Sequence, residues 1–304
     1  IHNNITSIGS YAFYNCKSIL NFTIPPKVTT IQSFIFWGCS NLSLIEVHDN
    51  VTSIGSYAFR ECQSLKNFTI PPKVTTIENY VFYRCSNLSS FEIHNNITSI
   101  GSYAFYNCKS FLNFTIPLKV TSIDIYSFSG CSNLLSIDFP DNVISIKSNA
   151  FSNCLRLRNF TIPPKITSIA NNLLSGCSDL TSIIIHDNVT SIGSYAFEFC
   201  KSLPNFTTPP KVTVISDYLL YKCYNLSSIE IHENVTSIGK FALSEIINIF
   251  NFTIPPKVTN ISAGLFVGCI NLLLIEIHDN VTSIGSNAFQ NCIGLKNFTI
   301  PPKV

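Results

Sequence analysis

The chain repeats one pattern of apolar and polar positions every 23 residues. Written in lines of 23 residues from Ile5, the sequence fills thirteen lines without an insertion or deletion and completes the last at Lys303. We call each line a repeat and number its positions from 1 to 23. Position 4 is isoleucine in all thirteen repeats, from Ile8 to Ile284, and position 9 is phenylalanine or leucine. A fixed period of this length indicates a solenoid in which each repeat stacks on its neighbours.

A second period of 46 residues pairs the repeats. Odd-numbered repeats end in sequences like "NFTIPPK", which begins at Asn21, whereas even-numbered repeats end in sequences like "IEVHDN", which begins at Ile45. In both, apolar residues alternate with polar ones near the end of the repeat, which predicts a short strand. The stretch "GSYAFYNC", which begins at Gly9, spaces its apolar residues by three and four and therefore predicts one helical or 3₁₀ turn.

We therefore predict a β-rich solenoid. It is a right-handed coil of 23-residue repeats with a parallel concave β-sheet on one side and short extended segments and 3₁₀ or helical turns on the other. The repeats occupy residues 5–303 in 46-residue pairs, and the predicted domain is a single solenoid over residues 1–304 with partial repeats at both ends. Because a solenoid repeat contacts only its neighbours, we expect caps or further repeats beyond both ends.

Composition excludes several classes of partner. Charged residues make up 12% of the chain and its net charge of +2 is spread along the sequence, so nothing predicts binding to nucleic acid or to an anionic membrane. The apolar runs are far shorter than the roughly 20 residues that cross a bilayer, so we expect no membrane insertion in this segment.

Nothing in the sequence predicts catalysis. The G-x-S-x-G, H-E-x-x-H and phosphate-binding glycine motifs are absent, and we expect neither an enzyme nor a cofactor. All twelve cysteines occupy position 12, and Ile246 stands there in the remaining repeat. An apolar replacement favours buried thiols over a zinc site or disulfides, so we predict no metal site.

The strands of the even repeats carry a recurring pair of polar residues. Because residues two apart share a face of a strand, each glutamate is expected beside its histidine at the rim or concave face of the solenoid. Two interpretations stay open: a ligand-binding or pH-sensitive stripe, and a solvated rim. The candidate binding residues are Glu46, His48, Glu92, His94, Glu230, His232, Glu276 and His278.

Asparagines in Asn-x-Ser/Thr sequences are candidate glycosylation sites, but they recur because the repeat recurs. We expect turn positions such as Asn50 to be used more readily than strand positions such as Asn21, because glycans on alternate strands would crowd one another. The candidates are Asn21, Asn50, Asn67, Asn96, Asn113, Asn159, Asn188, Asn205, Asn234, Asn251, Asn280 and Asn297.

Two further columns of side chains are regular. Position 7 is aromatic in nine repeats, beginning with Tyr11 and Phe34, and either packs between repeats or binds a sugar or protein. At the corner that ends each repeat, lysines such as Lys27 alternate with acids such as Asp49, which predicts a ladder of weak ion pairs.

The sequences "IPPKVTTIxxxxFxxCSNL" and "VTSIGSYAFYNCKSL" resemble the BspA-like, or Treponema pallidum, class of leucine-rich repeats. The I-G-x-x-A-F-x-x-C-x-x-L core is matched closely over residues 8–19, 54–65, 100–111 and 192–203, and the resemblance covers the whole chain. The even repeats depart from it by placing His-Asp-Asn where the family has a proline turn. The resemblance implies a surface protein of bacteria or protists, and it implies the fold more firmly than the function.

We therefore expect a non-catalytic scaffold at the cell surface or outside the cell that recognises a protein or glycan partner, as the resemblance implies for adhesion. One alternative is a structural protein that self-assembles into a spacer, filament or coat through open solenoid ends as a homo-oligomer. A further alternative is an intracellular adaptor. The identity of the partner cannot be read from the repeats.

Overall fold

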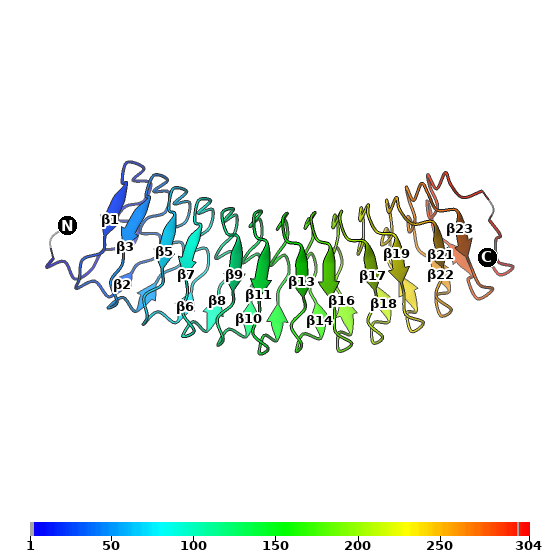
Figure 1. Cartoon of the computed structure of the whole chain (residues 1–304), viewed down its shortest axis with the longest axis horizontal. Helices are drawn as coiled ribbons and strands as arrows, with labels where there is room; N and C mark the ends of the chain where they lie inside the picture. The colour runs from blue at the N-terminus through cyan, green and yellow to red at the C-terminus, as the bar shows by residue number, and fades with distance from the viewer. Residues whose placement is uncertain (1–2, 297) are drawn as a thin grey trace. The chain divides into compact units, whose positions relative to one another are not determined.

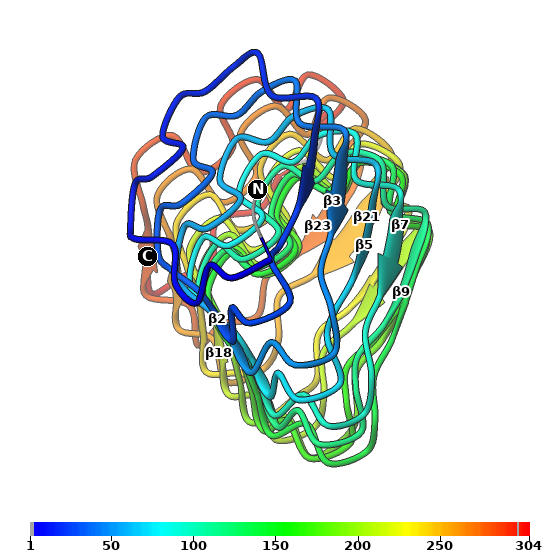
Figure 2. The same ribbon diagram turned by 90° about the vertical axis from the view of Figure 1, so that its left-hand side faces the viewer.

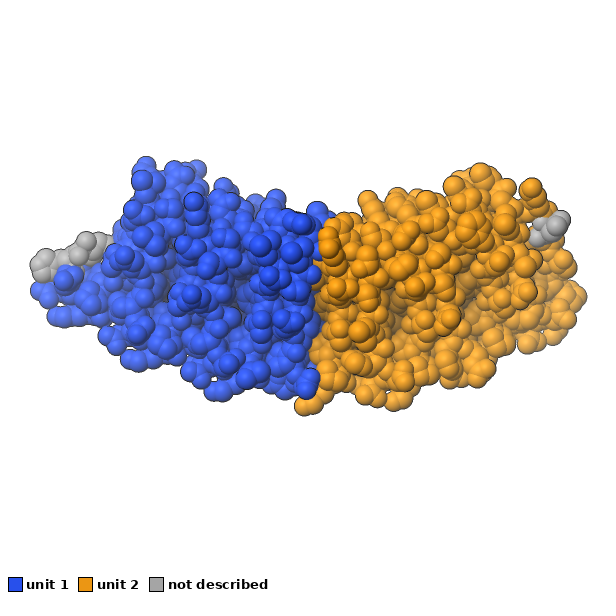
Figure 3. Space-filling model, viewed as in Figure 1, with its two compact units in different colours: residues 1–156 blue, residues 157–304 orange. Residues whose placement is uncertain are grey.

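The protein is described by a computed structural model that covers residues 3–296 and 298–304. The chain forms two compact units, Ile1–Arg156 (unit 1) and Leu157–Val304 (unit 2), which Figure 3 colours separately. Each unit is a parallel β-solenoid built from the 23-residue repeat, as the sequence predicts, and each is described by itself. Whether the two units form the single predicted domain stays a prediction.

Each repeat from the second to the twelfth contributes one two-residue strand and one three-residue strand, while β1 is the strand described in the first repeat and β24 the strand described in the last (Figure 1). In unit 1 the three-residue strands are β1 (Asn21–Thr23), β3 (Leu44–Glu46), β5 (Asn67–Thr69), β7 (Ser90–Glu92), β9 (Asn113–Thr115) and β11 (Ser136–Asp138). The two-residue strands are β2 (Thr30–Ile31), β4 (Ser53–Ile54), β6 (Thr76–Ile77), β8 (Ser99–Ile100), β10 (Ser122–Ile123) and β12 (Ser145–Ile146). Figure 2 shows β3, β5, β7 and β9 along one side of the coil and β2 on another.

Unit 2 repeats the same arrangement. Its three-residue strands are β13 (Asn159–Thr161), β15 (Ser182–Ile184), β17 (Asn205–Thr207), β19 (Ser228–Glu230), β21 (Asn251–Thr253) and β23 (Leu274–Glu276). Its two-residue strands are β14 (Ser168–Ile169), β16 (Ser191–Ile192), β18 (Val214–Ile215), β20 (Ser237–Ile238), β22 (Asn260–Ile261) and β24 (Ser283–Ile284). Within the described ranges no helix is long and apolar enough to cross a bilayer.

The three-residue strands pair in twos. In unit 1 the parallel pairs are β1–β3, β5–β7 and β9–β11, and in unit 2 they are β13–β15, β17–β19 and β21–β23. Each pair joins an odd repeat to the next even repeat, with Asn67 opposite Ser90 and Thr69 opposite Glu92. Among the described strands of unit 1, β3 does not pair with β5, nor β7 with β9. We call the boundary between two neighbouring three-residue strands that do not pair a seam. Because a seam follows every second repeat, the structural unit is a pair of repeats, which accounts for the 46-residue period.

The predicted turn segment is present, but it is a series of hydrogen-bonded turns rather than a helix. The Ala12 N–H donates to the Gly9 carbonyl and the Cys16 N–H to the Phe13 carbonyl, both three residues back. The N–H of Phe13 instead donates to the Ile35 carbonyl of the next repeat, 3.0 Å away. Positions 7 and 11 have positive φ in all thirteen repeats, as at Tyr11 (φ 61°), which interrupts any helix.

The core lies between the two strand types, as the columns predict. Ile31 and Phe36, at positions 4 and 9, are fully buried, and the isoleucine column is buried in every repeat except the last. Within a three-residue strand only the middle side chain points inward, as Phe68 does in β5. The turn segments link successive repeats of unit 1 across the seams, since the Phe36 N–H donates to the Ala58 carbonyl at 2.9 Å.

Candidate binding surface on the exposed strand face

The first and third residues of the three-residue strands form an exposed surface, which we call the strand face. The side chains of a strand alternate between its two sides, so these residues point away from the core. Odd repeats present asparagine and threonine, as Asn67 and Thr69 do on β5, and both are exposed. In the even repeats the third residues are Glu46, Glu92, Asp138, Ile184, Glu230 and Glu276.

Threonines hold the glutamates of the strand face in place. The Thr23 hydroxyl donates a hydrogen bond to Oε2 of Glu46 at 2.8 Å, and Thr69 donates likewise to Glu92 at 2.9 Å. The same contact recurs in unit 2 between Thr207 and Glu230 and between Thr253 and Glu276. Among the described residues the ion pairs join Arg60 to Glu61 and Lys222 to Glu245. The carboxylates of the strand face therefore have no cationic partner within the described chain.

The histidines are bound into the corner that follows each even strand. Nε2 of His48 lies 2.8 Å from the Pro25 carbonyl of the preceding repeat, and Nδ1 accepts a hydrogen bond from the Asn50 N–H at 3.3 Å. Because Nδ1 is an acceptor, the ring is the neutral tautomer that carries its proton on Nε2. His94 and His278 make the same two contacts, and Nδ1 of His232 accepts from the Asn234 N–H.

The structure thus separates the paired residues that the sequence places on one face. Glu46 bonds to Thr23, His48 bonds to Pro25, and no hydrogen bond or ion pair joins Glu46 to His48. In His48, His94 and His278 both ring nitrogens are already hydrogen-bonded, which leaves these three rings no free atom for a ligand. No group of three metal-ligating side chains occurs among the described residues. A ligand stripe built on Glu–His pairs gains no support, while the four glutamates stay candidate binding residues.

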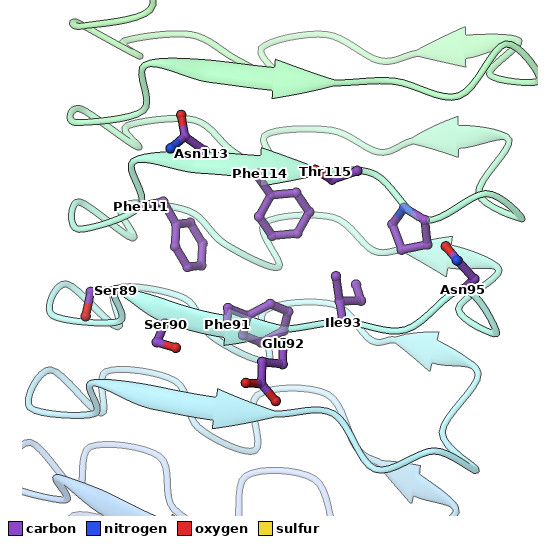
Figure 4. Close-up of a pocket in the computed structure, with 11 residues that line it drawn as sticks. Ser89, Ser90, Phe91, Glu92, Ile93, Asn95, Phe111, Asn113, Phe114 and Thr115 are labelled. Carbon is purple, nitrogen blue, oxygen red and sulfur yellow. The ribbon is translucent and has the colours of Figure 1, made fainter.

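Two grooves lie in the strand face at the seams of unit 1. The larger, about 640 Å³, lies between β7 and β9, and its floor includes Phe91, Phe111 and Phe114. Figure 4 shows the rings of Phe111 and Phe114 between the two strands, with Ser90 and Asn113 on either side. The second groove, about 310 Å³, lies between β3 and β5 and is lined by Leu44, Ile45, Glu46, Val47, Asn67, Phe68 and Thr69. Both are open and have apolar floors and polar rims.

The corner lysines bond to asparagine rather than to acids. Nζ of Lys73 donates to the Asn50 side-chain oxygen at 3.2 Å, and Lys119 donates to Asn96 at the same distance. Each of these bonds crosses a seam between an even repeat and the next odd repeat. Lys257 makes the equivalent contact with Asn234 in unit 2 at 2.9 Å. The expected ladder of ion pairs is therefore wrong, because the asparagine side chain at position 23 lies nearer to the lysine than the neighbouring acid does.

The candidate glycosylation sites are accessible. The strand asparagines are exposed at the first residue of their strands, namely Asn21, Asn67, Asn113, Asn159, Asn205 and Asn251. The turn asparagines Asn50, Asn96, Asn188 and Asn280 are exposed, and Asn234 is half-buried. Asn297 lies outside the described residues. Use of these sites stays a prediction.

The cysteine column is buried and its thiols are hydrogen-bonded. Cys62 is fully buried, and its sulfur donates to the Phe36 carbonyl 3.2 Å away. Burial raises the pKa of the Cys39 thiol to about 11 and that of Cys223 to about 12. None of the twelve cysteines is in a disulfide, and all are buried except Cys16 and Cys292, which are half-buried. A raised pKa suppresses the reactive thiolate, which agrees with a packing role.

Sequence reasoning missed a second aromatic column. Among the first five repeats, position 10 holds Arg60 in the third and an aromatic residue in the other four, namely Tyr14, Trp37, Tyr83 and Tyr106. The Arg60 guanidinium lies 4.6 Å from the Trp37 ring centre and 4.5 Å from that of Tyr83. The position-7 rings stack on one another instead of presenting open faces, which favours their interpretation as packing between repeats. The sequence signal for this column was an aromatic residue three positions after the aromatic residue of position 7.

The seam grooves were also missed. The sequence signal was the larger even-strand residue Phe91, where the other even repeats carry isoleucine, next to Phe111, where other odd repeats of unit 1 carry isoleucine or leucine. Phe91 is half-buried, as are Ile137, Ile183 and Ile229 at the middle of β11, β15 and β19, whereas the middle residues of the odd strands are buried.

Comparison with known proteins identifies the repeat. A sequence profile described as "BspA type Leucine rich repeat region" matches the chain in six copies, over residues 1–111, 98–226 and 213–304. No curated protein sequence matches the chain.

Solved structures are similar over nearly the whole chain. A leucine-rich repeat protein from Bacteroides ovatus is 26% identical with a TM-score of 0.81, and the match covers 96% of this chain and 81% of that one. A leucine rich cell surface protein from Faecalibacterium prausnitzii is 28% identical with a TM-score of 0.64, covering 91% and 86%. A leucine-rich repeat protein from Eubacterium ventriosum, 21% identical with a TM-score of 0.58 and coverage of 97% and 87%, is similar in fold.

Proposed function

The chain belongs to the family of BspA-type leucine-rich repeat proteins, and on that premise we propose that it is a non-catalytic binding scaffold of the cell surface or extracellular space. In this proposal the strand face recognises a protein or glycan partner. Fold alone does not define a function, so the proposal depends on the chemistry of the surface.

The observation that carries the proposal is the contrast between the interior and the strand face. Cys62 and Leu65 are fully buried, while Asn67, Thr69 and Glu92 are exposed on the strand face. Hydroxyl, amide and carboxylate groups repeated at a regular spacing suit many weak contacts with one extended partner, and such contacts gain affinity together.

The cell-surface location is supported by similarity. The Faecalibacterium prausnitzii protein is described as a leucine rich cell surface protein and is 28% identical over 91% of this chain. Antibodies against the chain are expected to label intact, unpermeabilised cells of its natural source or the medium around them. Labelling that requires permeabilisation would contradict this part of the proposal and favour an intracellular adaptor.

Blocking one face at a time tests the strand face. In a background with Cys16 and Cys292 replaced by alanine, the remaining cysteines are buried, so a new surface thiol can be coupled selectively to polyethylene glycol. We expect the polymer on a Thr69→Cys variant to reduce retention of the protein on intact cells or extracellular material of its source. The matched control is Lys109→Cys, at an exposed turn position of the same unit. Equal retention of both conjugates would contradict the proposal.

A further inference from the structure

The groove between β7 and β9 departs from the repeat at two positions. Phe91, the middle residue of β7, stands where the other even repeats carry isoleucine, and Phe111 stands where the other odd repeats carry isoleucine or leucine. Both lie at the same seam, whose groove measures about 640 Å³ against about 310 Å³ for the groove between β3 and β5. A local break in an otherwise regular repeat is where a specific site is expected.

Aromatic rings from two repeats form the floor of this groove. The ring centre of Phe91 lies 6.0 Å from that of Phe111 and 6.1 Å from that of Phe114, both in the next repeat (Figure 4). Phe111 and Phe114 are buried, whereas Phe91 is half-buried. Phe91 therefore provides the aromatic surface that a ligand in the groove can reach.

The walls of the groove carry hydrogen-bond donors without a partner in the described chain. Thr23 and Thr69 each donate to a glutamate, but the residue opposite Thr115 is the shorter Asp138, and the Thr115 hydroxyl makes no hydrogen bond to any described residue. The Ile116 N–H donates to the Asp138 carbonyl within the β9–β11 pair, so the preceding N–H, that of Thr115, points to the seam. Thr115 thus offers two donors at the groove.

The charge of the groove favours an uncharged ligand. Glu92 is the one acid among its lining residues, and no base lines it. Oε2 of Glu92 accepts from Thr69, and Oε1 is the acceptor that remains for a ligand. An anionic ligand would meet this carboxylate without a compensating cation, since no strand of unit 1 contains lysine or arginine. The groove therefore combines donors, an acceptor and an apolar floor.

The seam disfavours an inserted peptide strand. The Phe82 N–H donates to the Ala104 carbonyl at 2.9 Å, and β6 pairs directly with β8, so the same two repeats are hydrogen-bonded elsewhere around the coil. A strand inserted between β7 and β9 would require two ladder spacings between them, about 9.6 Å. An α-helix with its side chains is wider still, about 10–12 Å. These bonds between the repeats oppose an opening of that size.

We propose that the β7–β9 groove binds a neutral oligosaccharide made of hexopyranose units. A pyranose ring presents carbon–hydrogen groups on its faces and hydroxyl groups around its edge, which matches an aromatic floor between hydrogen-bonding walls. One ring face packs on Phe91, while hydroxyls accept from Thr115 and donate to Glu92, because a hydroxyl does both. The groove volume lies within the range of roughly 300–1,000 Å³ that is typical of small-molecule sites.

This inference rests on the proposed function, since it names the partner class of the same face. The probes are cellohexaose, maltohexaose and β-1,4-mannohexaose, each titrated into the unglycosylated full chain by isothermal titration calorimetry, with hexagalacturonate as the anionic control. We expect at least one neutral hexasaccharide to bind with a Kd of about 1 mM or below. Its affinity should be equal at low and high salt, because no charge is engaged. No binding of any neutral probe, or tighter binding of hexagalacturonate, would overturn the proposal.

Two variants show whether this groove is the site. Phe91→Ile restores the residue of the other even repeats and should weaken binding about tenfold, because the aromatic surface is lost. Thr115→Val removes the hydroxyl at nearly constant shape and should weaken it roughly fivefold. The matched control is Thr161→Val, at the same exposed position of β13 in unit 2, which should bind like the parent. Parent-like affinity in both groove variants would overturn the proposal.

Failure here is distinguishable from failure of the proposed function. If no hexasaccharide binds but polymer at Thr69 still blocks retention, the strand face binds a partner of different chemistry, such as a protein, and only this inference fails. Far-ultraviolet circular dichroism and urea unfolding verify the fold of each variant. If Phe91→Ile does not fold, Thr115→Val against Thr161→Val decides.

Discussion

The ring of Tyr57 lies parallel to that of Tyr80 in the next repeat, with ring centres 4.5 Å apart and an angle of 7° between the planes. Both residues have positive φ, 64° and 60°, a conformation that costs free energy for a bulky side chain. Asn149 and Gly264 occupy the same position in other repeats and adopt this conformation with less strain. Aromatic stacking therefore offsets a backbone strain that the repeat imposes at position 7.

Substitution of Tyr80 separates the two effects. Tyr80→Ala removes stacking with Tyr57 and Tyr103 but retains the strain, and we expect it to lower the free energy of unfolding by about 1–3 kcal/mol. Tyr80→Asn loses the same stacking but tolerates positive φ, so it should be less destabilising, by up to about 1 kcal/mol. Urea unfolding of the two variants provides the measurement. An asparagine variant no more stable than the alanine variant would refute the strain argument.

Alkaline pH should destabilise the protein through its buried thiols. Burial raises the pKa of Cys223 from its ordinary value of 9.0 to about 12. Below pH 9 the thiol is protonated in both states and its contribution to stability is complete. Between pH 9 and 12 the unfolded state ionises while the folded state does not, so the contribution is lost as pH rises.

A cysteine variant isolates this effect from other groups that titrate at high pH. We expect Cys223→Ala to be less stable than the parent at pH 8, because a buried side chain is truncated. Between pH 8 and 10.5, however, it should lose about 2 kcal/mol less stability than the parent does. Urea unfolding at both pH values measures the difference. Identical losses in parent and variant would mean that Cys223 ionises equally easily in both states.

Deletions test whether the strand pair is the structural unit. Removing residues 51–96 deletes two repeats and joins an even repeat to an odd one, which preserves every type of neighbour. Removing residues 51–73 deletes only one repeat but places the Glu46 and Glu92 strands side by side, which sets like charges opposite each other and loses the Thr69–Glu92 hydrogen bond. We expect the longer deletion to give the higher urea midpoint. The opposite order would show that single repeats stack independently of pairing.

Glycan occupancy provides a test of the free strand face. In protein purified from its natural source we expect glycans at exposed turn positions such as Asn50 and Asn96 and none at Asn67 and Asn113 on the strands. Glycans on the strands would cover the seam grooves, because Asn113 lines the β7–β9 groove and Asn67 lines the β3–β5 groove. Mass spectrometry of glycopeptides reads each site. Occupied strand asparagines would contradict binding through this face.

The sequence predicts the fold well because one periodicity determines it. Burial of Ile31, Phe36 and Cys39 follows from the columns alone, since a position that is apolar in thirteen stacked repeats has only one way to avoid water. The pairing of Asn67 with Ser90 follows from the fixed repeat length.

The features that the sequence did not predict depend on which of several similar hydrogen-bond partners a side chain or backbone group bonds to. His48 was expected beside Glu46 because the two residues are two positions apart, but its ring reaches the Pro25 carbonyl and the Asn50 N–H beyond the end of the strand. The seams likewise follow from where backbone bonds are omitted, and the 46-residue period shows that repeats differ in pairs without showing which neighbouring strands are left unpaired. The positive φ at positions 7 and 11 was not predicted, because a tyrosine, unlike a glycine, is not a sequence signal for positive φ.

Hydrogen exchange at β5 tests the central claim, that strand pairs separated by open seams form the strand face. The Ile70 N–H donates to the Glu92 carbonyl at 3.0 Å within the β5–β7 pair, whereas the preceding N–H, that of Thr69, points to the opposite side of the strand, toward the β3–β5 seam. We predict that the Thr69 amide exchanges at least about a hundredfold faster than the Ile70 amide in the free protein, measured residue by residue by nuclear magnetic resonance. Equal protection of the two amides would show a continuous sheet without seams and would contradict the account.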